Sequence, residues 1–305
     1  MYHRVKPHPL KVLLNQIIGR IAVAGLWLMR LFDRKSMADF MGRLISTIGP
    51  WLPVHRVGRA NLQAAYPEKS AAEIEGILGG VWDGLGRVAA EFAHLDRIKI
   101  DDPEQPGAAD VTYDRTALAE LELVRNGAKP TIFFAAHIGN WEIPALIPPL
   151  AGLECYVLYR PPNIGPINDA ILGLRTSCMA TLVATELDAP LRLGNALKKG
   201  AHVGMLVDQH LTSGVDVMFF GRKCKANPLV AQLARRFECP IRGIRAVRRH
   251  DRNTFVADVT APLEFPRDPD GKINVQATMQ AVTSIIEGWV REFPEQWLWL
   301  HRRWR

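Results

Sequence analysis

Short apolar runs alternate with longer amphipathic segments from residue 111 onward, and this alternation constrains the fold more than any other feature of the chain. The apolar runs predict strands at 131–136, 154–159, 181–185, 202–207, 241–247 and 254–261. The segments between and around them predict helices at 114–126, 141–150, 165–176, 188–199, 226–237 and 274–292. Such alternation indicates an α/β sheet with helices on both faces. The turn formers HDRN at 250–253 predict a late hairpin, so we expect a mixed, mostly parallel sheet.

The first hundred residues have a helical pattern instead. One candidate helix runs from about Lys35 to Ile48, and another starts at Ser70, where Glu73 completes a capping box, and runs towards Asp96. A polar Pro/Gly connector follows at 101–110. We expect a single α/β domain over 36–305, composed of a helical prelude, 36–100, and a catalytic core, 111–305, behind an N-terminal helix within 1–35.

The N-terminal segment Leu10 to Phe32 is mostly apolar but contains three cations, Lys11, Arg20 and Arg30. Its longest uncharged stretch, 21–29, is far shorter than the ~20 residues that span a bilayer. No small-residue cleavage site follows, so it is not a clean signal peptide. A spanning anchor with Arg20 snorkelling, an amphipathic helix in the membrane interface and a soluble helix covering a core all stay open. We expect membrane association.

The chain of 305 residues carries a net charge of +7 with a pI near 9.4. This excess favours acidic partners such as an anionic membrane surface, a phosphorylated substrate or an acidic carrier protein. No zinc-finger spacing, RNA-binding motif or long basic run is present, so we expect no nucleic-acid partner. Cys155, Cys178, Cys224 and Cys239 are scattered, which indicates reduced thiols rather than a disulfide framework.

The stretch FFAAHIGNWEIPAL, 133–146, predicts a buried strand, a tight turn at Gly139-Asn140 and a helix. His137 stands at the exit of the strand and Glu142 in the first helical turn. Across a turn the two side chains can converge, and a carboxylate that fixes one imidazole nitrogen leaves the other free to take a proton from a hydroxyl. The helix N-terminus would help to keep Glu142 ionised. A structural interpretation, with a first-turn acid and a satisfied strand-end histidine, stays open.

Other polar residues follow predicted strands, where the sites of open α/β sheets gather. Arg160 and Asp208 each follow a strand, and Arg222 follows Phe219-Phe220 beside Lys223 and Lys225. Three strand ends that supply a base, a cation and an acid can form one site. Their structural alternatives are a solvated cation for Arg160, a turn acid or helix cap for Asp208, and core packing for the phenylalanines.

Metal and cofactor chemistry find little support in the sequence. His137, Glu142, Asp208 and His210 come from separate segments, and no HExxH pair exists, so we expect no metal. No G-x-S-x-G elbow, Walker loop or G-x-G-x-x-G after a strand is present, and we expect no cofactor.

The stretch from His137 to Glu142 resembles the His-x4-Asp/Glu motif of the lysophospholipid acyltransferase superfamily. Several further segments resemble blocks of the lipid A lauroyl/myristoyl (late) acyltransferases, in that family's order over about 58–303. These segments are Asn61-Leu62 with Tyr66-Pro67-Glu68, Tyr159-Arg160-Pro161, Asp208-Gln209, Phe219-Phe220-Gly221 and PEQWLWLHRR at 294–303. Each match alone is weak, and together they are specific. The family usually has a second acid after the Asp-Gln pair, where this chain has His210.

The resemblance implies transfer of a fatty acyl group from acyl carrier protein to a hydroxyl of a Kdo-lipid IVA-type precursor in lipopolysaccharide biosynthesis, at the cytoplasmic face of the inner membrane. His137 would act as the general base and Glu142 would orient it. Arg160, or backbone N–H groups near Gly139 and Asn140, would stabilise the oxyanion; Arg160 would alternatively hold a phosphate of the acceptor. Asp208 and Arg222 are further candidates for substrate binding.

Three rival interpretations stay open at this level. The same chemistry can act on another acceptor, such as a phosphatidylinositol mannoside or a lysophospholipid. The chain can be a membrane-surface lipid-binding protein without catalysis, although the intact His137/Glu142 pair argues against that. A thioesterase side reaction, with water in place of the acceptor, is the third.

Overall fold

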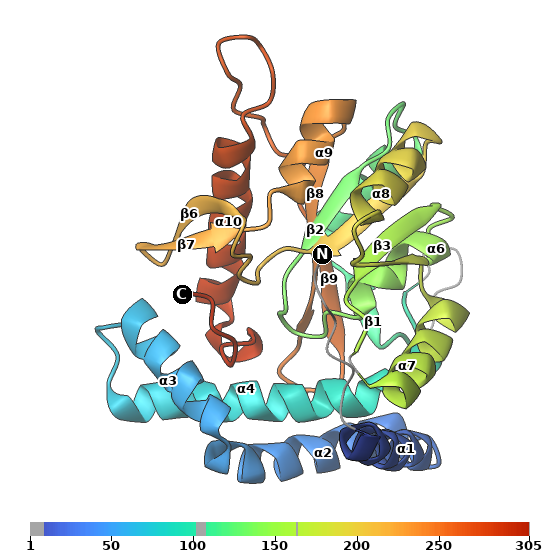
Figure 1. The fold of residues 1–305 in the computed structure, drawn as a ribbon, viewed down its shortest axis with the longest axis vertical. Helices are drawn as coiled ribbons and strands as arrows, with labels where there is room; N and C mark the ends of the chain where they lie inside the picture. The colour runs from blue at the N-terminus through green and yellow to red at the C-terminus, as the bar shows by residue number, and fades with distance from the viewer. Residues whose placement is uncertain (1–8, 102–107, 163, 305) are drawn as a thin grey trace.

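A seven-stranded sheet forms the centre of the molecule in the computed structural model, which describes residues 9–101, 108–162 and 164–304 (Figure 1). The strand order is β1-β9-β8-β2-β5-β3-β4. The strands are β1 (Val111–Tyr113), β2 (Ile132–Ala135), β3 (Cys155–Tyr159), β4 (Thr181–Ala184), β5 (His202–Leu206), β8 (Ile241–Arg248) and β9 (Phe255–Val259). Only the β8–β9 pair is antiparallel among these described strands. The predicted mixed, mostly parallel sheet and its late hairpin are confirmed.

Helices cover both faces of this sheet, as the alternating pattern predicts. In β2 the side chains of Phe133 and Ala135 join one core cluster, and those of Ile132 and Phe134 join the other. This is the period-two alternation of a strand that is buried on both faces. Helices α8 (Ala189–Lys198), α9 (Leu229–Phe237) and α10 (Val275–Glu292) pack in the second cluster, whereas α5 (Arg115–Arg125) and α6 (Ile147–Leu150) pack in the first.

Several elements differ from the sequence prediction, and strand β1 (Val111–Tyr113) is one that was not predicted. The helix expected at 141–150 is broken into a 3-10 turn, η3 (Ile143–Ala145), and the short α6, because prolines at 144, 148 and 149 interrupt the backbone hydrogen bonds. An additional helix, α3 (Pro53–Ala65), occupies part of the segment left unassigned. A separate antiparallel hairpin, β6 (Val215–Phe219) and β7 (Arg222–Ala226), was also missed.

The N-terminal helices form a layer at one end of the molecule. Helix α4 (Ala71–Phe92) crosses beneath the sheet in Figure 1, α2 (Arg34–Ile48) lies against α4, and α1 (Pro9–Met29) is seen at the same lower end. The predicted capping box at Ser70 and Glu73 starts α4. Helices α2 and α4 approach closely because Gly86 has no side chain; a Cβ there would lie 2.2 Å from the Met41 carbonyl oxygen.

Helix α7 (Gly165–Cys178) completes this end and packs against α1, while the short turns η1 (Gly49–Trp51), η2 (Leu95–Arg97) and η4 (Pro294–Gln296) connect the larger elements. None of the helices in the described ranges is long and apolar enough to cross a bilayer. Residues 1–8 of the expected N-terminal segment and 102–107 of the expected connector lie outside the described residues.

Candidate active site

The turn after β2 is fixed by close backbone contacts. Gly139 has φ of +58°, and a Cβ there would lie 2.0 Å from the carbonyl oxygen of Ala246, so glycine is required. The N–H of Gly139 donates to the carbonyl of Gln296 at 3.0 Å, and the N–H of Asn140 donates to the carbonyl of Ala246 at 3.1 Å. The turn thereby holds His137 at the carboxyl end of β2.

His137 and Asp208 form the polar centre of the site. They follow β2 and β5, which are adjacent parallel strands, so both side chains emerge at the same edge of the sheet. The imidazole Nδ1 lies 2.8 Å from Asp208 Oδ1, and the backbone N–H of His137 donates to Oδ2 at 2.9 Å. The indole N–H of Trp297 donates to the same Oδ2 at 2.8 Å. Asp208 is only 2 % exposed, and these three contacts hold it in one orientation.

The two groups shift each other's proton affinity. Burial alone would lower the pKa of His137, but the charge and hydrogen bond of the Asp208 carboxylate, with a smaller contribution from Glu142, raise it above the usual 6.5. Burial alone would raise the pKa of Asp208, yet the charge and hydrogen bonds of His137 and the charge of His301 lower it well below its usual value. Asp208 is therefore a carboxylate, and it stabilises the imidazolium form of His137.

The second imidazole nitrogen faces outward. An ionised Asp208 accepts a hydrogen bond from Nδ1–H, so the lone pair of the neutral ring lies on Nε2. The amide Nε2 of the exposed Gln209 lies 3.4 Å from this atom, and the ring of Trp141 lies 5.4 Å from the imidazole, centroid to centroid. The His137 side chain is 15 % exposed. The arrangement presents one basic nitrogen to a molecule that approaches past Gln209.

Glu142 takes a different partner from the one expected. We expected its carboxylate to fix an imidazole nitrogen of His137, but Asp208 occupies that place. Glu142 instead accepts a bidentate pair from Arg175 on α7, at 2.6 and 2.9 Å. The cause is local, since the Asn140 side chain accepts the N–H of Glu142 and starts η3 with Glu142 directed towards α7. Glu142 acts on His137 only through its charge.

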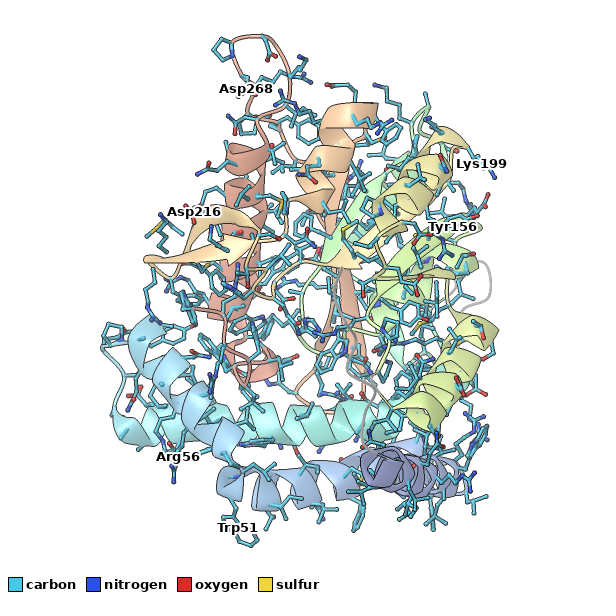
Figure 2. The ribbon with its side chains drawn as sticks, in the orientation of Figure 1. Trp51, Arg56, Tyr156, Lys199, Asp216 and Asp268 are labelled. Carbon is cyan, nitrogen blue, oxygen red and sulfur yellow. The ribbon has the colours of Figure 1, made fainter. Side chains whose placement is uncertain are left out.

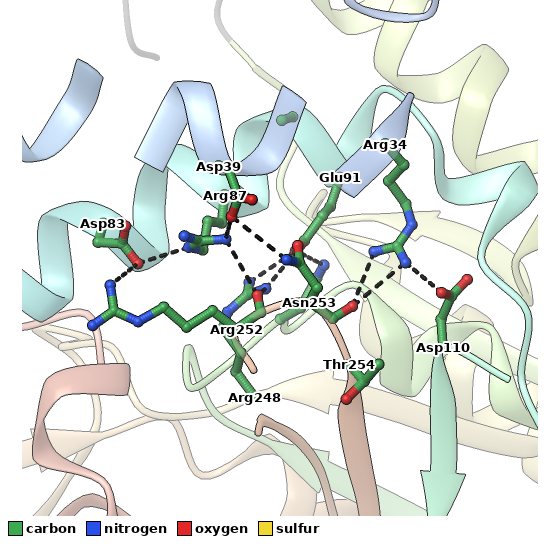
Figure 3. Close-up of polar contacts among 12 residues, drawn as sticks. Arg34, Asp39, Asp83, Arg87, Glu91, Asp110, Arg248, Arg252, Asn253 and Thr254 are labelled. Carbon is green, nitrogen blue, oxygen red and sulfur yellow. Dashed lines mark hydrogen bonds and ion pairs between the residues drawn. The ribbon is translucent and has the colours of Figure 1, made fainter. Parts of the chain in front are cut away.

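A buried carboxylate lies behind the turn. Glu91 on α4 is fully buried, accepts a hydrogen bond from the Asn140 amide at 2.9 Å, and pairs with Arg248 of β8 at 2.5 and 2.8 Å. Figure 3 shows Glu91 and Arg248 within a larger polar network that joins α2, α4, the β8–β9 turn and Asp110. Arg87 pairs with Asp39 and Asp83 within the N-terminal helices, and Arg34 pairs with Asp110. Glu91 with Arg248, and Asp83 with Arg252, join α4 to β8 and the β8–β9 turn.

The remaining predicted residues have varied surroundings. The N–H groups of Gly139 and Asn140, expected as oxyanion donors, are already bonded to backbone carbonyls and are not free for that role. Arg160 is exposed after β3, the strand next to β5, and has no ion-pair partner within the described ranges. Arg222 begins β7 and lies over the Trp304 ring at 4.7 Å, and no contact in the described part of the chain joins it to His137.

Two cavities meet at Trp141. One, of about 380 Å³, lies between α2, α4 and α7 and is lined mainly by apolar side chains, with the Glu142–Arg175 pair at one wall. Its lining includes Ile45, Ile48, Leu52, Trp82, Leu85, Val88, Phe92 and Ile171. The other, of about 670 Å³, has a mixed lining of apolar and charged side chains and lies between α4, the β8–β9 turn and η4. Trp141 and Leu85 border both cavities.

Three residues of this site were not singled out from the sequence. Trp297 belonged to a motif block but had no assigned contact, and Arg175 is one cation in a helix with no distinguishing pattern. Glu91 left a readable signal, because it is a lone carboxylate in the apolar helical stretch RVAAEF, 87–92. A buried acid needs a partner, so this position predicts an ion pair.

A histidine–carboxylate pair that follows two adjacent parallel strands lies where open α/β sheets usually place their ligand sites. The chain matches the family model of the bacterial lipid A biosynthesis acyltransferases over residues 8–305, and it belongs to that family. It is accordingly an acyltransferase. A comparison with curated proteins gave no match.

Proposed function

We propose that the protein transfers a fatty acyl group from acyl carrier protein to a hydroxyl of a phosphorylated glycolipid of the Kdo-lipid IVA type, in lipopolysaccharide biosynthesis. The observation that carries this proposal is the position of His137. Its Nδ1 is held by a buried carboxylate, while Nε2 is available near Trp141, which borders an apolar cavity. The family supplies the class of reaction, and the geometry supplies a base suited to it.

In this mechanism His137 Nε2 takes the proton of the acceptor hydroxyl as the oxygen attacks the thioester carbonyl. Asp208 stabilises the imidazolium that forms, and general-base help of this kind contributes roughly 10²–10⁴ in rate. When the tetrahedral intermediate collapses, the carbon–sulfur bond breaks and the departing thiolate of the carrier takes the proton from His137. The reaction forms an ester and a free carrier thiol, and needs no covalent enzyme intermediate, because the thioester is already activated.

The oxyanion needs a donor outside the turn, since the Gly139 and Asn140 N–H groups are committed. The Gln209 amide is the nearest candidate, 3.4 Å from Nε2 of the base. A bound hydroxyl would take its place at Nε2 and leave the amide beside the reacting carbon. Arg160, exposed after the neighbouring strand, is the candidate for either the oxyanion or a phosphate of the acceptor. Glu142 contributes by its charge and by holding Arg175.

The acyl chain has a suitable place in the cavity between α2, α4 and α7. Its walls are mainly aliphatic and aromatic, and one of them is Trp141, whose ring lies 5.4 Å from the His137 ring, centroid to centroid. A hydrocarbon chain gains about 0.8 kcal/mol for each methylene that it buries, so the length of such a cavity selects chain length. The excess of positive charge would attract an acidic carrier protein and the anionic cytoplasmic face of the inner membrane.

The test is an acyl-transfer assay with purified protein, acyl carrier protein loaded with chains of several lengths, and a Kdo-modified tetra-acylated lipid A precursor. His137→Ala and Asp208→Ala are compared with the wild type, with circular dichroism as the check on folding. Transfer by the wild type and its near-loss in both variants supports the proposal. Full activity in His137→Ala removes the proposed base. Transfer only to a phosphatidylinositol mannoside or lysophospholipid moves the acceptor, and thioester hydrolysis without transfer identifies a thioesterase.

A further inference from the structure

Exposed large apolar side chains gather on the N-terminal helices. They come from two places within the first 52 residues: helix α1, and the edge formed by α2 and η1. The α1 members are Leu13, Leu14, Ile17, Ile18, Ile21, Trp27 and Leu28, followed by Leu31 and Phe32. The members beyond residue 35 are Phe40, Leu44, Ile48, Trp51 and Leu52, which we call the α2–η1 edge. An apolar surface of this extent on one side of a protein marks an interaction site.

Trp51 is the most exposed aromatic residue of the α2–η1 edge, at 79 %. In Figure 2 it projects from the lower end of the molecule, and Arg56 from α3 projects on the same side. Tryptophan with nearby cations is the composition that suits a bilayer interface, where the ring sits at the headgroup level.

The charge distribution points to an anionic surface. Residues 9–65 contain eight lysines and arginines and only two acidic residues. This segment therefore carries most of the +7 net charge of the chain. Arg20, Arg43 and Arg56 are exposed and have no ion-pair partner in the described ranges. Cations beside an apolar surface are attracted to anionic lipid headgroups while the apolar side chains enter the interface. The same positive charge would hinder close pairing with a second copy of this surface.

The edge is also continuous with the apolar cavity. Ile48 and Leu52 are exposed on the α2–η1 edge and also line the cavity that Trp141 borders. A bilayer in contact with this edge would therefore meet one wall of the cavity. A hydrocarbon chain could then pass from the bilayer into the cavity without entering water. Exposure to water would cost free energy for each methylene of the chain.

We propose that the α2–η1 edge is a second membrane-contacting element, which docks the enzyme on an anionic bilayer together with α1. The contact surface then extends past residue 35, the limit expected from the sequence, as far as Arg56. This inference rests on the proposed function only in taking the acceptor to be a membrane lipid. The partner of the α2–η1 edge is the bilayer surface rather than a protein.

The test measures binding of the full chain to vesicles of phosphatidylethanolamine and phosphatidylglycerol by cosedimentation, without any acyl donor. Leu44→Ser combined with Trp51→Ser removes two exposed side chains that do not line the cavity. The matched control is Leu187→Ser with Leu191→Ser. Leu187 precedes α8 and Leu191 lies in its first turn, and Figure 1 shows α8 away from α1 and α2. We expect the edge variant to bind about tenfold more weakly and the control to bind as the wild type does.

Arg43→Gln with Arg56→Gln gives the charge arm of the same experiment. We expect this variant to lose binding to anionic vesicles and to change little with neutral ones. Equal binding by the edge variant and the wild type overturns the proposal, and so does a change in oligomeric state on size-exclusion chromatography without a change in vesicle binding. The binding test measures no acyl transfer, so its result can be interpreted even if the proposed activity is not found.

Discussion

The buried carboxylate of Glu91 accepts a hydrogen bond from the side-chain amide of Asn140 at 2.9 Å. Asn140 uses its amide oxygen to accept the N–H of Glu142, so Glu91 orients the residue that shapes the turn after β2. Glu91 also neutralises Arg248, which places a salt bridge between α4 and β8 next to the turn that follows His137. The N-terminal helices thus support the site as well as covering one end of the sheet.

Replacement of Glu91 by Gln is expected to destabilise the protein by roughly 3–5 kcal/mol, since it leaves the buried Arg248 guanidinium without a counter-charge. Urea denaturation followed by circular dichroism measures this change. Glu238→Gln is the matched control, because Glu238 pairs with Arg267 at the exposed surface, where we expect little shift in the midpoint. Similar midpoints for both variants would show that the buried pair does not stabilise the fold.

The pH profile of Asp208→Asn tests the histidine–carboxylate pair. His137 must be neutral to act as a base, and its raised pKa means that wild-type activity increases as pH rises through a value above 6.5. Loss of the carboxylate lowers that pKa, so the acid limb of kcat/KM should move to lower pH. The plateau should fall by roughly 10²–10⁴ at the same time. A fall in the plateau with no displacement of the limb would argue against this pairing.

Glu142→Gln should have a smaller effect on His137 than Asp208→Asn. Glu142 raises the pKa of His137 through its charge and makes no hydrogen bond to the ring. We expect the acid limb to move slightly to lower pH and kcat to fall by no more than about tenfold. Rates measured across the same pH range decide the point. A loss as large as that of Asp208→Asn would mean that Glu142 contacts His137 when substrate is bound.

Changes in the apolar cavity should alter the preferred acyl chain. Val88→Phe fills space between α2, α4 and α7, and Ile171→Ala opens it. We expect shorter chains to be favoured in the first variant and longer chains in the second, with about 0.8 kcal/mol at stake for each methylene. Competition between carrier proteins loaded with different chains measures the ratio of products. Unchanged ratios in both folded variants would place the acyl chain elsewhere.

The sequence predicted those parts of the site that depend on neighbours along the chain. The strand at 131–136, the Gly139-Asn140 turn and the position of His137 follow from local apolar pattern and turn chemistry. Partner choice did not follow, because it depends on strand order. β5 lies between β2 and β3 in the sheet, and this places Asp208, 71 residues away in sequence, beside His137. Nothing in the spacing of His137 and Glu142 indicates that a distant acid will form the hydrogen bond with the imidazole.

The same limit applies to helices and surfaces. The pattern at 141–150 suits a helix, and three prolines nevertheless turned it into two short pieces that aim Glu142 at α7. The apolar character of α1 led to the expectation of membrane association, whereas no comparable pattern marked the α2–η1 edge in the sequence. Phe40, Leu44 and Trp51 look like ordinary core residues until the packing of α2 on α4 shows which face is left uncovered.

The segment 296–298 reaches the site from the far end of the chain. Its backbone bonds to Gly139 and His137, and the Trp297 indole holds Asp208. During synthesis the sheet strands through β9 emerge from the ribosome before this segment does. The growing chain can therefore gather its scaffold while the histidine and its carboxylate still lack their final support. Completion of the histidine–carboxylate pair would therefore be a late step of folding, after every strand of the described sheet has been made.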